Sequence, residues 1–401
     1  MQNNLPANWP LVKLGDICEF IYGKGLPKRL RVEAGVYPVY GSNGVVGHHD
    51  KYIVEKPCLI VGRKGAAGAI HLSNKDCWPI DTTYFIKPNE KYSLKFLFYL
   101  LKNLRLNSLD KSTAIPGLNR NDAYSLQIPL PPIKEQHRIV EKIEELFSEL
   151  DNGIENLKKA KDQIKTYRQA VLKYAFEGKL TNGKSEKAKG KGENGELPEG
   201  WKWVKLEKLS ELITKGASPR WQGFNYINDE SQTLFITSEN VKENYLEFKK
   251  LKYLEDTFNQ KQKRSILKRG DVLFNLVGAS IGRAAIYNLN RKSNINQAVA
   301  LIRLRGDLNT NYLSYFLNSN IAKQKYMMDI ADVARANLSL TDTSNILVPL
   351  CSIPEQTKIV QEIESRFSVA DKMEQSIDES LQKAESLRQS ILKQAFEGKL
   401  V

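Results

Sequence analysis

The chain contains few of the residues that most often carry catalysis or bind metals. It has 4 histidines and 4 cysteines among 401 residues, and no two cysteines show the C-x-x-C spacing of a metal site or redox pair. The adjacent His48 and His49 have no acidic or cysteine neighbour at ligand spacing, so we predict no metal site. The cysteines are expected to be reduced, mostly buried thiols of a cytoplasmic protein: Cys18, Cys58, Cys77 and Cys351.

Several longer signals are also missing from the sequence. No run of about 18 apolar residues could cross a membrane, and the first residues, MQNNLPANWP, do not have the pattern of a signal peptide. There is no G-x-x-x-x-G-K-[ST] phosphate loop. The D/N-P-P-Y/F signature of methyltransferases is absent too, because Pro131-Pro132 is followed by Ile133. We therefore predict no catalytic residue and no cofactor in this chain.

What the sequence does contain is a surplus of positive charge. Lys and Arg number 60 against 46 Asp and Glu, which gives a formal net charge of +14. A surplus of this size is typical of proteins with a polyanionic partner, most often nucleic acid; a basic surface kept for solubility is the alternative. The hydrophobic fraction of 41% indicates a folded chain, and its length favours two or more domains.

A long internal repeat organises the sequence. The letters AFEGKL occur at 175–180 and again at 395–400, and Glu135-Gln136 matches Glu355-Gln356 at the same offset, 355 − 135 = 220. The segments that precede these copies are repeated less faithfully, as in VGRKGAAGAI (61–70) and VGASIGRAAI (277–286). Two domains that share a frame but differ in their loops are expected to bind two related but different ligands.

The repeat predicts five consecutive parts. Residues 181–196 are rich in Lys, Gly, Glu and Asn and have no apolar residue larger than alanine, which indicates a flexible linker. The predicted parts are a first globular domain (1–132), a first long helix (133–180), the linker (181–196), a second globular domain (197–352) and a second long helix (353–401).

Both long helices carry an apolar seam with steps of three and four residues. The seam of the second helix is Ile359, Ile363, Phe367, Ala370, Met373, Ile377, Leu381, Ala384, Leu387, Ile391 and Ala395. A helix of about 47 residues is roughly 70 Å long and cannot bury such a seam alone. We expect the two helices to pair with each other in antiparallel orientation; the alternative is that each packs separately on its own domain.

A domain ends in IPLPPIKEQHRIV (128–140), a long helix that ends in AFEGKL follows it, and the whole is repeated. This arrangement resembles the specificity subunit of type I restriction-modification systems. The second copy departs from the family pattern, because residues 348–352 (VPLCS) lack the proline pair. The resemblance covers essentially the entire chain.

The resemblance implies an α+β fold with two globular α/β target recognition domains, separated by two long antiparallel coiled-coil helices with pseudo-two-fold symmetry. Each domain would read one half of a split, asymmetric site in double-stranded DNA. The helices would set the spacer and dock two modification subunits, and restriction subunits would join in the full complex. S-adenosylmethionine, ATP and Mg would be bound by those partners, and this chain would be a non-catalytic cytoplasmic protein that directs DNA methylation.

Candidate DNA-binding residues are polar or basic and stand in Gly-rich or polar segments of both domains. Those in the first domain are Lys24, Lys28, Arg29, Tyr40, Ser42, Asn43, Arg63, Lys64, Asn119 and Arg120. Those in the second domain are Lys215, Arg220, Asn275, Ser280, Arg283, Arg335 and Asn337, with Trp221 beside Arg220. An ordinary hairpin turn remains the alternative for residues 40–44, and a solvated face the alternative for the basic cluster that begins at Lys24.

Two other functions fit parts of the sequence. A coiled-coil scaffold could use basic domains to bind acidic proteins, although it would not need different loops on a shared frame. A tandem RNA-binding protein is the other alternative, but the RNP1-type aromatic motif of many RNA readers is not evident.

Overall fold

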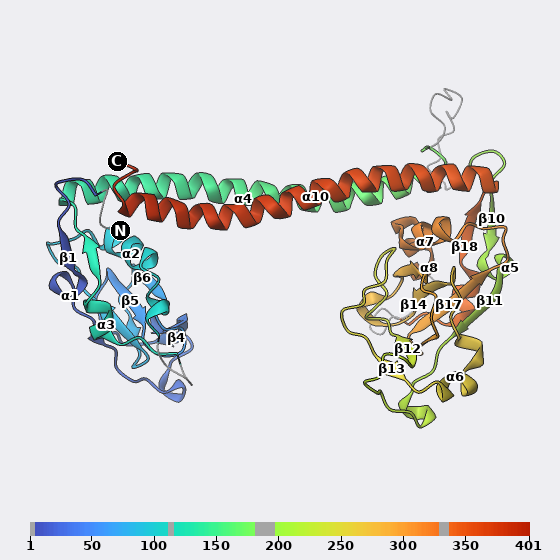
Figure 1. Ribbon diagram of the computed structural model, residues 1–401, viewed down its shortest axis with the longest axis horizontal. Helices are drawn as coiled ribbons and strands as arrows, with labels where there is room; N and C mark the ends of the chain where they lie inside the picture. Colours follow the sequence, from blue (N-terminus) through green and yellow to red (C-terminus); the bar gives the residue numbers. More distant parts are fainter. Residues whose placement is uncertain (1–4, 111–115, 181–196, 329–336) are drawn as a thin grey trace. The chain divides into compact units, whose positions relative to one another are not determined.

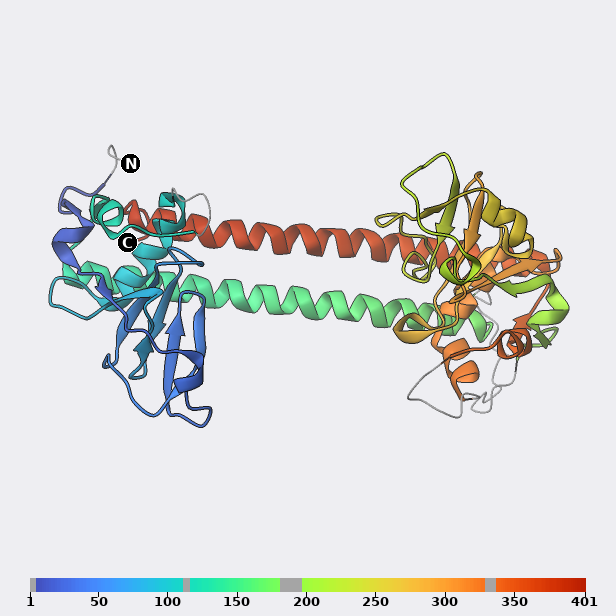
Figure 2. The same cartoon turned by 90° about the horizontal axis from the view of Figure 1, so that it is seen from below.

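The computed structural model describes residues 5–110, 116–180, 197–328 and 337–401 and shows a mixture of helices and sheets (Figures 1 and 2). The chain forms two compact units: the first holds Met1–Lys159 and Ile377–Val401, and the second holds Ala160–Ser376. Each unit therefore contains one globular domain and a part of each long helix. The predicted linker at 181–196 and the candidate Arg335 lie outside the described residues.

The core of the first unit is a four-stranded antiparallel sheet in the order β2-β8-β5-β6, next to a three-stranded sheet in the order β4-β3-β7. A short pair, β1 with β9, joins the start and the end of the domain. The elements are β1 (Leu11–Lys13), α1 (Leu14–Ile17), β2 (Ile21–Tyr22), η1 (Lys28–Leu30), β3 (Tyr37–Gly41), β4 (Gly44–His49), β5 (Cys58–Gly62), β6 (Ile70–Ser73), β7 (Trp78–Pro79), β8 (Thr83–Ile86), α2 (Leu94–Asn103), η2 (Leu106–Leu109), α3 (Arg120–Tyr124) and β9 (Gln127–Pro129).

The second unit has sheets with the same strand plan, β11-β17-β14-β15 and β13-β12-β16, and the pair β10 with β18. The sequence repeat is therefore a repeat of the fold. The elements are β10 (Lys202–Lys205), α5 (Leu206–Leu209), β11 (Ser210–Lys215), η3 (Arg220–Gln222), β12 (Thr233–Ile236), β13 (Tyr253–Leu254), α6 (Thr257–Lys261), η4 (Lys263–Ser265), β14 (Val272–Asn275), η5 (Gly278–Ser280), β15 (Ala284–Ile286), β16 (Ser293–Ile295), β17 (Val299–Leu304), α7 (Thr310–Asn318), α8 (Asn320–Met328), α9 (Leu340–Asn345) and β18 (Leu347–Leu350).

Backbone hydrogen bonds fix which loop residues of the two domains are equivalent. The Leu118 N–H donates to the Arg63 carbonyl at 2.8 Å, and the Leu338 N–H donates to the Leu276 carbonyl at 2.8 Å. The local offset at Arg63 is therefore 276 − 63 = 213, and not the 216 of the ungapped sequence alignment. That alignment was wrong here because the loop between the hairpin strands changes length while the ladder hydrogen bonds keep their register.

The long helices are α4 (Ile133–Phe176) and α10 (Ile353–Phe396), each of 44 residues. Their first turns are held by the same contact in both units. The Trp9 indole N–H donates to Glu135 at 2.6 Å, and the Trp201 indole N–H donates to Glu355 at 3.1 Å. A carboxylate in the first turn is also favourable to the helix dipole. The repeated Glu therefore ties the start of each helix to the start of its own domain.

The neighbouring glutamines make a second recurring contact. Gln136 accepts from the backbone N–H of Ser93 at 2.8 Å, and Gln356 accepts from the backbone N–H of Asn309 at 2.8 Å. Both glutamine side chains are buried, at 1% and 0% exposure, so losing either would leave a partly buried backbone donor unpaired. The Glu-Gln pair of the sequence repeat is thus explained by internal contacts.

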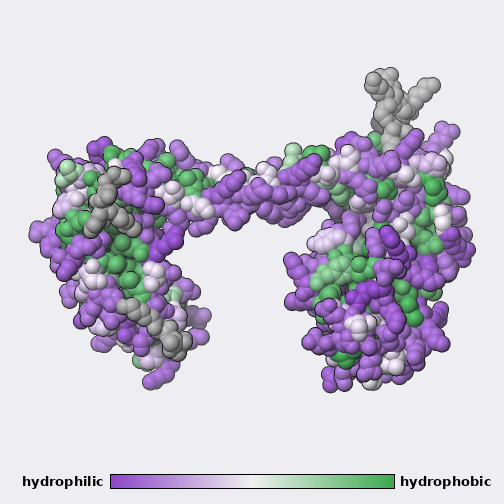
Figure 3. Space-filling model, in the orientation of Figure 1, coloured by the Kyte–Doolittle hydropathy of each residue, from purple (hydrophilic) through white to green (hydrophobic). Residues whose placement is uncertain are grey.

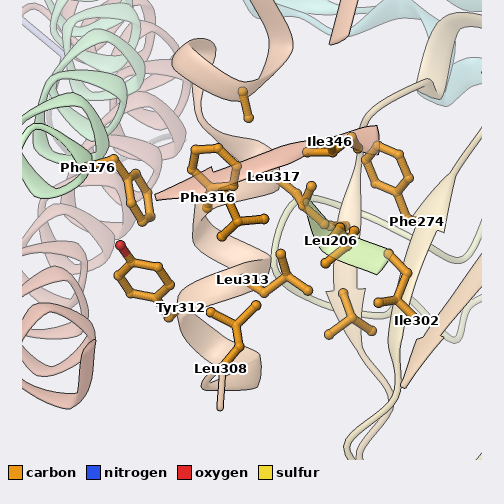
Figure 4. Close-up of a cluster of buried hydrophobic side chains, with 14 of the residues drawn as sticks. Phe176, Leu206, Phe274, Ile302, Leu308, Tyr312, Leu313, Phe316, Leu317 and Ile346 are labelled. Carbon is orange, nitrogen blue, oxygen red and sulfur yellow. The ribbon is translucent and has the colours of Figure 1, made fainter. Parts of the chain in front are cut away.

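The two AFEGKL segments close the cores. Phe176, at the end of α4, packs edge-on against Tyr312 and Phe316 in the core of the second unit (Figure 4). Phe396, at the end of α10, packs against Phe96 in the core of the first unit. Each long helix therefore ends in the core of the domain that it does not follow in sequence.

The glycines of the two segments end the helices. Gly178 and Gly398 have φ of +68° and +71°, a conformation that favours glycine at a helix C-terminus. A Cβ at Gly178 would lie 2.2 Å from Pro198, and one at Gly398 would lie 2.4 Å from Pro6. Both the backbone conformation and the space exclude larger residues, which accounts for the repeated glycine.

The predicted seam is buried near the domains and is partly exposed elsewhere. Ile359 and Ile363 are fully buried, whereas Met373 and Leu387 are 57% and 49% exposed. The seam prediction was therefore wrong for Met373 and Leu387. The visible surface of the long helices is mainly hydrophilic (Figure 3), while Ile164, Ala370 and Ala384 are buried without belonging to either domain core.

Candidate nucleic-acid interface

An exposed tyrosine in the first unit lies between two arginines. The Tyr22 ring, at the end of β2, is 50% exposed. The guanidinium carbons of Arg63 and Arg120 lie 5.3 and 5.1 Å from its centroid. Both distances are in the range of cation–π attraction. We call these three residues the Arg–Tyr–Arg cluster; it joins two predicted candidates to a residue that the sequence prediction missed.

Each member of the cluster is held by a neighbouring contact. Arg63 donates twice to the Asp81 carbonyl, from Nε at 3.0 Å and from Nη2 at 2.7 Å. Arg120 is the first residue of α3, whose N-cap is Asn119 with a side chain that accepts from the Asn121 N–H at 2.9 Å. Asn119 is exposed, but this contact gives it a structural role in placing Arg120.

The cluster is positively charged. Tyr84 lies behind Tyr22, with ring centroids 5.0 Å apart. Burial and the hydrogen bond to Tyr22 raise the pKa of Tyr84 to about 12, while the charges of Arg63 and Arg120 act in the opposite direction. Tyr84 is therefore neutral at physiological pH. Two guanidinium groups with carbonyl and aromatic neighbours attract an anion such as a nucleic-acid phosphate.

The turn between β3 and β4 contacts the loop that follows β5. The Ser42 hydroxyl donates to the Lys64 carbonyl, and a ring nitrogen of His71 lies 3.1 Å from the Ser42 carbonyl oxygen. Ser42 is buried at 9% exposure, so its hydroxyl supports the loop and is not free to contact DNA, a correction to its prediction. Asn43 and Lys64 are exposed beside it, and Tyr40 is half-buried.

The remaining candidates of the first domain lie on the segment after β2. Lys24, Lys28 and Arg29 are all exposed. The backbone of Lys24 is fixed on both sides, because its N–H donates to the Pro79 carbonyl at 3.0 Å and its carbonyl accepts from the Trp78 indole at 2.8 Å. These side chains are placed to contact a ligand, and their role stays a prediction.

Among its described residues, the second unit has no copy of the Arg–Tyr–Arg cluster. Lys215 ends β11 as Tyr22 ends β2, and buried Leu276 takes the place of Arg63. Leu340 follows the N-cap of α9 as Arg120 follows the N-cap of α3. The same frame thus presents different side chains in the two domains.

A basic hollow of about 410 Å³ in the second unit contains two predicted candidates. It is lined by Ser238, Glu239, Asn240, Lys242, Glu247, Lys249, Lys250, Ala279, Ser280 and Arg283. Arg283 makes no hydrogen bond or ion pair of its side chain with the residues that the structure describes. The hydrogen bonds of Lys249 and Lys242 lower the pKa of Glu247, so its carboxylate stays charged. Cations outnumber acids here, which favours an anionic ligand.

The register places Arg283 at the level of Ala69 of the first domain. The Asn275 N–H donates to the Arg283 carbonyl at 2.9 Å, as the Gly62 N–H donates to the Ala69 carbonyl at 2.8 Å. Arg283 is therefore not the counterpart of Arg63. It lies on the opposite side of the hairpin loop, where the first domain has alanine.

The prediction that Asn275 contacts DNA was wrong for the folded chain. Asn275 is 0% exposed, and its amide donates to the Ser238 carbonyl at 2.9 Å. It positions a residue that lines the basic hollow. Asn337 is exposed and bridges to Val277, and Lys215 is exposed at the end of its strand.

Other kinds of site are not supported in the part of the chain that the structure describes. No group of three or more metal-binding side chains gathers among residues 5–110, 116–180, 197–328 and 337–401. Within the same residues, every helix is too short or too polar to span a bilayer. All four cysteines are free and buried.

Comparison with known proteins gives a consistent match. The family model described as the type I restriction modification DNA specificity domain matches residues 6–165 and 198–383. The EcoBI specificity subunit of Escherichia coli is 29% identical over 78% of this chain and 66% of its own length. The EcoDI specificity subunit of the same organism is 22% identical over 99% of this chain and 89% of its own.

Two solved structures share the fold. One comes from work on complex assembly and conformational transition of the type I R-M system. It has a TM-score of 0.72 and 21% identity, and the match covers 99% of this chain and 100% of the other. The other, the HsdS subunit of Thermoanaerobacter tengcongensis, has a TM-score of 0.58 and 22% identity, with 100% and 99% covered.

Proposed function

The chain belongs to the type I restriction modification DNA specificity family, and we propose on this basis that its two domains read the two halves of a split site in double-stranded DNA. Specificity subunits are the non-catalytic DNA-recognition components of these systems. The observation that carries the proposal is the contrast between the two domains: one strand plan presents the Arg–Tyr–Arg cluster in the first unit and a basic hollow in the second. Different side chains on one frame suit an asymmetric site.

The long helices suit the role of a spacer. We propose that they form one antiparallel coiled-coil pair with pseudo-two-fold symmetry. The contacts of each unit support this, because Arg168 of α4 pairs with Asp371 of α10 at 2.6 Å and Arg388 of α10 pairs with Asp151 of α4. The positions are equivalent in the repeat, since 388 − 168 and 371 − 151 both equal 220.

Modification subunits would dock on the exposed apolar residues of these helices. Tyr167 and Leu387 are 42% and 49% exposed and occupy equivalent repeat positions, 387 − 167 = 220. One such residue in each unit provides two similar docking positions, which agrees with two modification subunits. S-adenosylmethionine, ATP and Mg would then be bound by partner subunits, and the complex would act on DNA in the cytoplasm.

Methylation mapping in the host tests this function. A split adenine-methylated motif that disappears when the gene is deleted is the expected result, and an unchanged methylome contradicts it. Gel shifts of the purified chain with its modification subunits should show duplex binding that falls steeply with salt, because the net charge is +14. Preference for single strands or RNA would favour the RNA-binding alternative, and binding of acidic proteins alone would favour the scaffold.

The spacer role has its own test. Inserting about four residues at equivalent positions of both helices lengthens each by roughly 6 Å, so the preferred gap should grow by one or two base pairs. A gap of unchanged length would show that the helices do not set the spacing.

A further inference from the structure

The two domains contain an equivalent short turn, which follows the prolines of the similar segments GKGLP (23–27) and KGASP (215–219). The turn η1 begins after Pro27, and the turn η3 begins after Pro219. In each, the residue three positions later donates its backbone N–H to that proline: Leu30 to Pro27 at 2.9 Å and Gln222 to Pro219 at 2.9 Å. The offset, 219 − 27 = 192, is that of the start of the domain repeat. The two turns are therefore the same structural element.

The equivalent turns present different side chains at the same two positions. Lys28 corresponds to Arg220, and Arg29 corresponds to Trp221. All four residues are exposed, and none of their side chains makes a hydrogen bond or ion pair within the described residues. A basic residue is kept at the first position, while the second changes from a cation to an indole. Such a change at a shared exposed position is expected where two domains contact different ligands.

The backbone of each turn is fixed although its side chains are free. Arg31 donates to the Val46 carbonyl at 2.9 Å and anchors η1 on β4. Lys261 donates to the Gln222 carbonyl at 2.9 Å and anchors η3 on α6. Both turns are therefore fixed platforms for the residues that they present. A turn that is already fixed loses little conformational entropy when it binds a ligand.

Among the residues that the structure describes, Trp221 is the most exposed of the large apolar side chains, at 86%. Leaving an indole in water is unfavourable because it forgoes the burial of a large apolar area. Arg220 precedes it, and the ammonium of Lys261 is held beside the turn, so the surroundings suit a polyanion. Aromatic side chains with cationic neighbours stack on nucleic-acid bases or enter between base steps.

We propose that Trp221 inserts against the bases of the half-site read by the second domain and unstacks one base step there, while Arg29 at the equivalent place in the first domain makes a polar contact without unstacking. This inference rests on the proposed function, because it assumes that the second domain binds duplex DNA. It assigns a specific mode of contact to Trp221, whereas the neighbouring residues indicate only that the surroundings are basic.

The experiment uses the full chain with its modification subunits and a duplex that carries the mapped split motif. 2-Aminopurine is placed at successive positions of both half-sites, and its fluorescence rises where a base loses its stacking neighbour. The wild type should show a rise at one step of the second half-site. Trp221→Ala should abolish that rise and weaken binding by roughly fivefold to a hundredfold; Trp221→Phe should keep part of both.

Two matched variants sharpen the result. Arg29→Ala alters the same turn of the first domain and should leave the fluorescence of the second half-site unchanged. Tyr174→Ala removes another exposed aromatic residue, on α4, and should change neither quantity. An identical rise with Trp221→Ala, or no rise in a wild type that binds tightly, overturns the inference and leaves the proposed function intact. A wild type without sequence-specific duplex binding would instead refute the proposed function.

Discussion

The two recognition domains share one fold but present different side chains at several equivalent positions. Arg63 has buried Leu276 in its place, and Arg29 has Trp221. In contrast, the buried contacts of Gln136 and Gln356 have the same length in both units. The comparison shows that the buried glutamine contacts are retained between the copies, whereas loop residues such as Arg63 differ even where they make internal hydrogen bonds.

The largest expected effect comes from the ends of the two long helices, each of which lies in the core of the domain that the helix does not follow in sequence. Phe176→Ala and Phe396→Ala each remove a buried ring, which typically costs about 3–5 kcal/mol. Because Phe176 belongs to the core of the second unit and Phe396 to that of the first, hydrogen exchange should rise mainly in the second domain for the former and in the first domain for the latter. A rise confined to the domain that each helix follows in sequence would contradict this assignment of the two rings to the cores.

The next effect separates the two half-sites. Arg63→Ala, combined with Arg120→Ala, removes both cations of the Arg–Tyr–Arg cluster, and each lost contact should cost about 1–3 kcal/mol. Competition with duplexes mutated in one half-site should show relaxed reading of one half only. Arg283→Ala is the matched variant and should relax the other half. Equal loss at both half-sites for either variant would contradict separate reading.

A smaller, stoichiometric effect tests partner docking. Tyr167→Asp and Leu387→Asp place a charge on one exposed apolar position in each unit, and a charge at an apolar contact opposes docking. Native mass spectrometry should show one modification subunit lost with each single variant and two lost with the double variant. Unchanged assembly of the double variant would place the docking surface elsewhere.

The smallest effect at neutral pH is a pH dependence from a buried thiol, which appears only in alkaline solution. Burial raises the pKa of Cys18 from 9.0 to about 12. Above about pH 9 the unfolded thiol loses its proton while the folded thiol keeps it, so stability falls as pH rises. The slope is about 1.4 kcal/mol per pH unit for one group between these limits. Cys18→Ala should remove this share from the pH dependence of chemical unfolding; an unchanged slope would contradict it.

Much of the fold was predictable because it depends on local patterns. The apolar seam and the repeated AFEGKL segment predicted two long helices, and the structure has α4 and α10 in those places. The exposure of Met373 was not predictable, since periodicity shows which side of a helix a residue lies on and not whether a neighbour covers it.

The candidate site was predictable only by residue type. Arg63 and Arg120 were chosen as basic residues in polar loops, but nothing near Tyr22 in the sequence marks it as their partner. Asn275 was chosen for the same reasons and is buried. Its place at the end of a buried strand, β14, fitted both a ligand contact and a structural role, because an asparagine there can face a ligand or donate to a neighbouring carbonyl.

The sequence by itself determined the duplication, the two long helices and the basic character of the chain, because repeats, periodicity and charge are properties of neighbouring residues or of simple sums. The tertiary structure alone decided that each AFEGKL end closes the other domain's core, and that Tyr22 meets two arginines. These depend on contacts between segments far apart in the chain, whose partners are fixed only when the whole core packs.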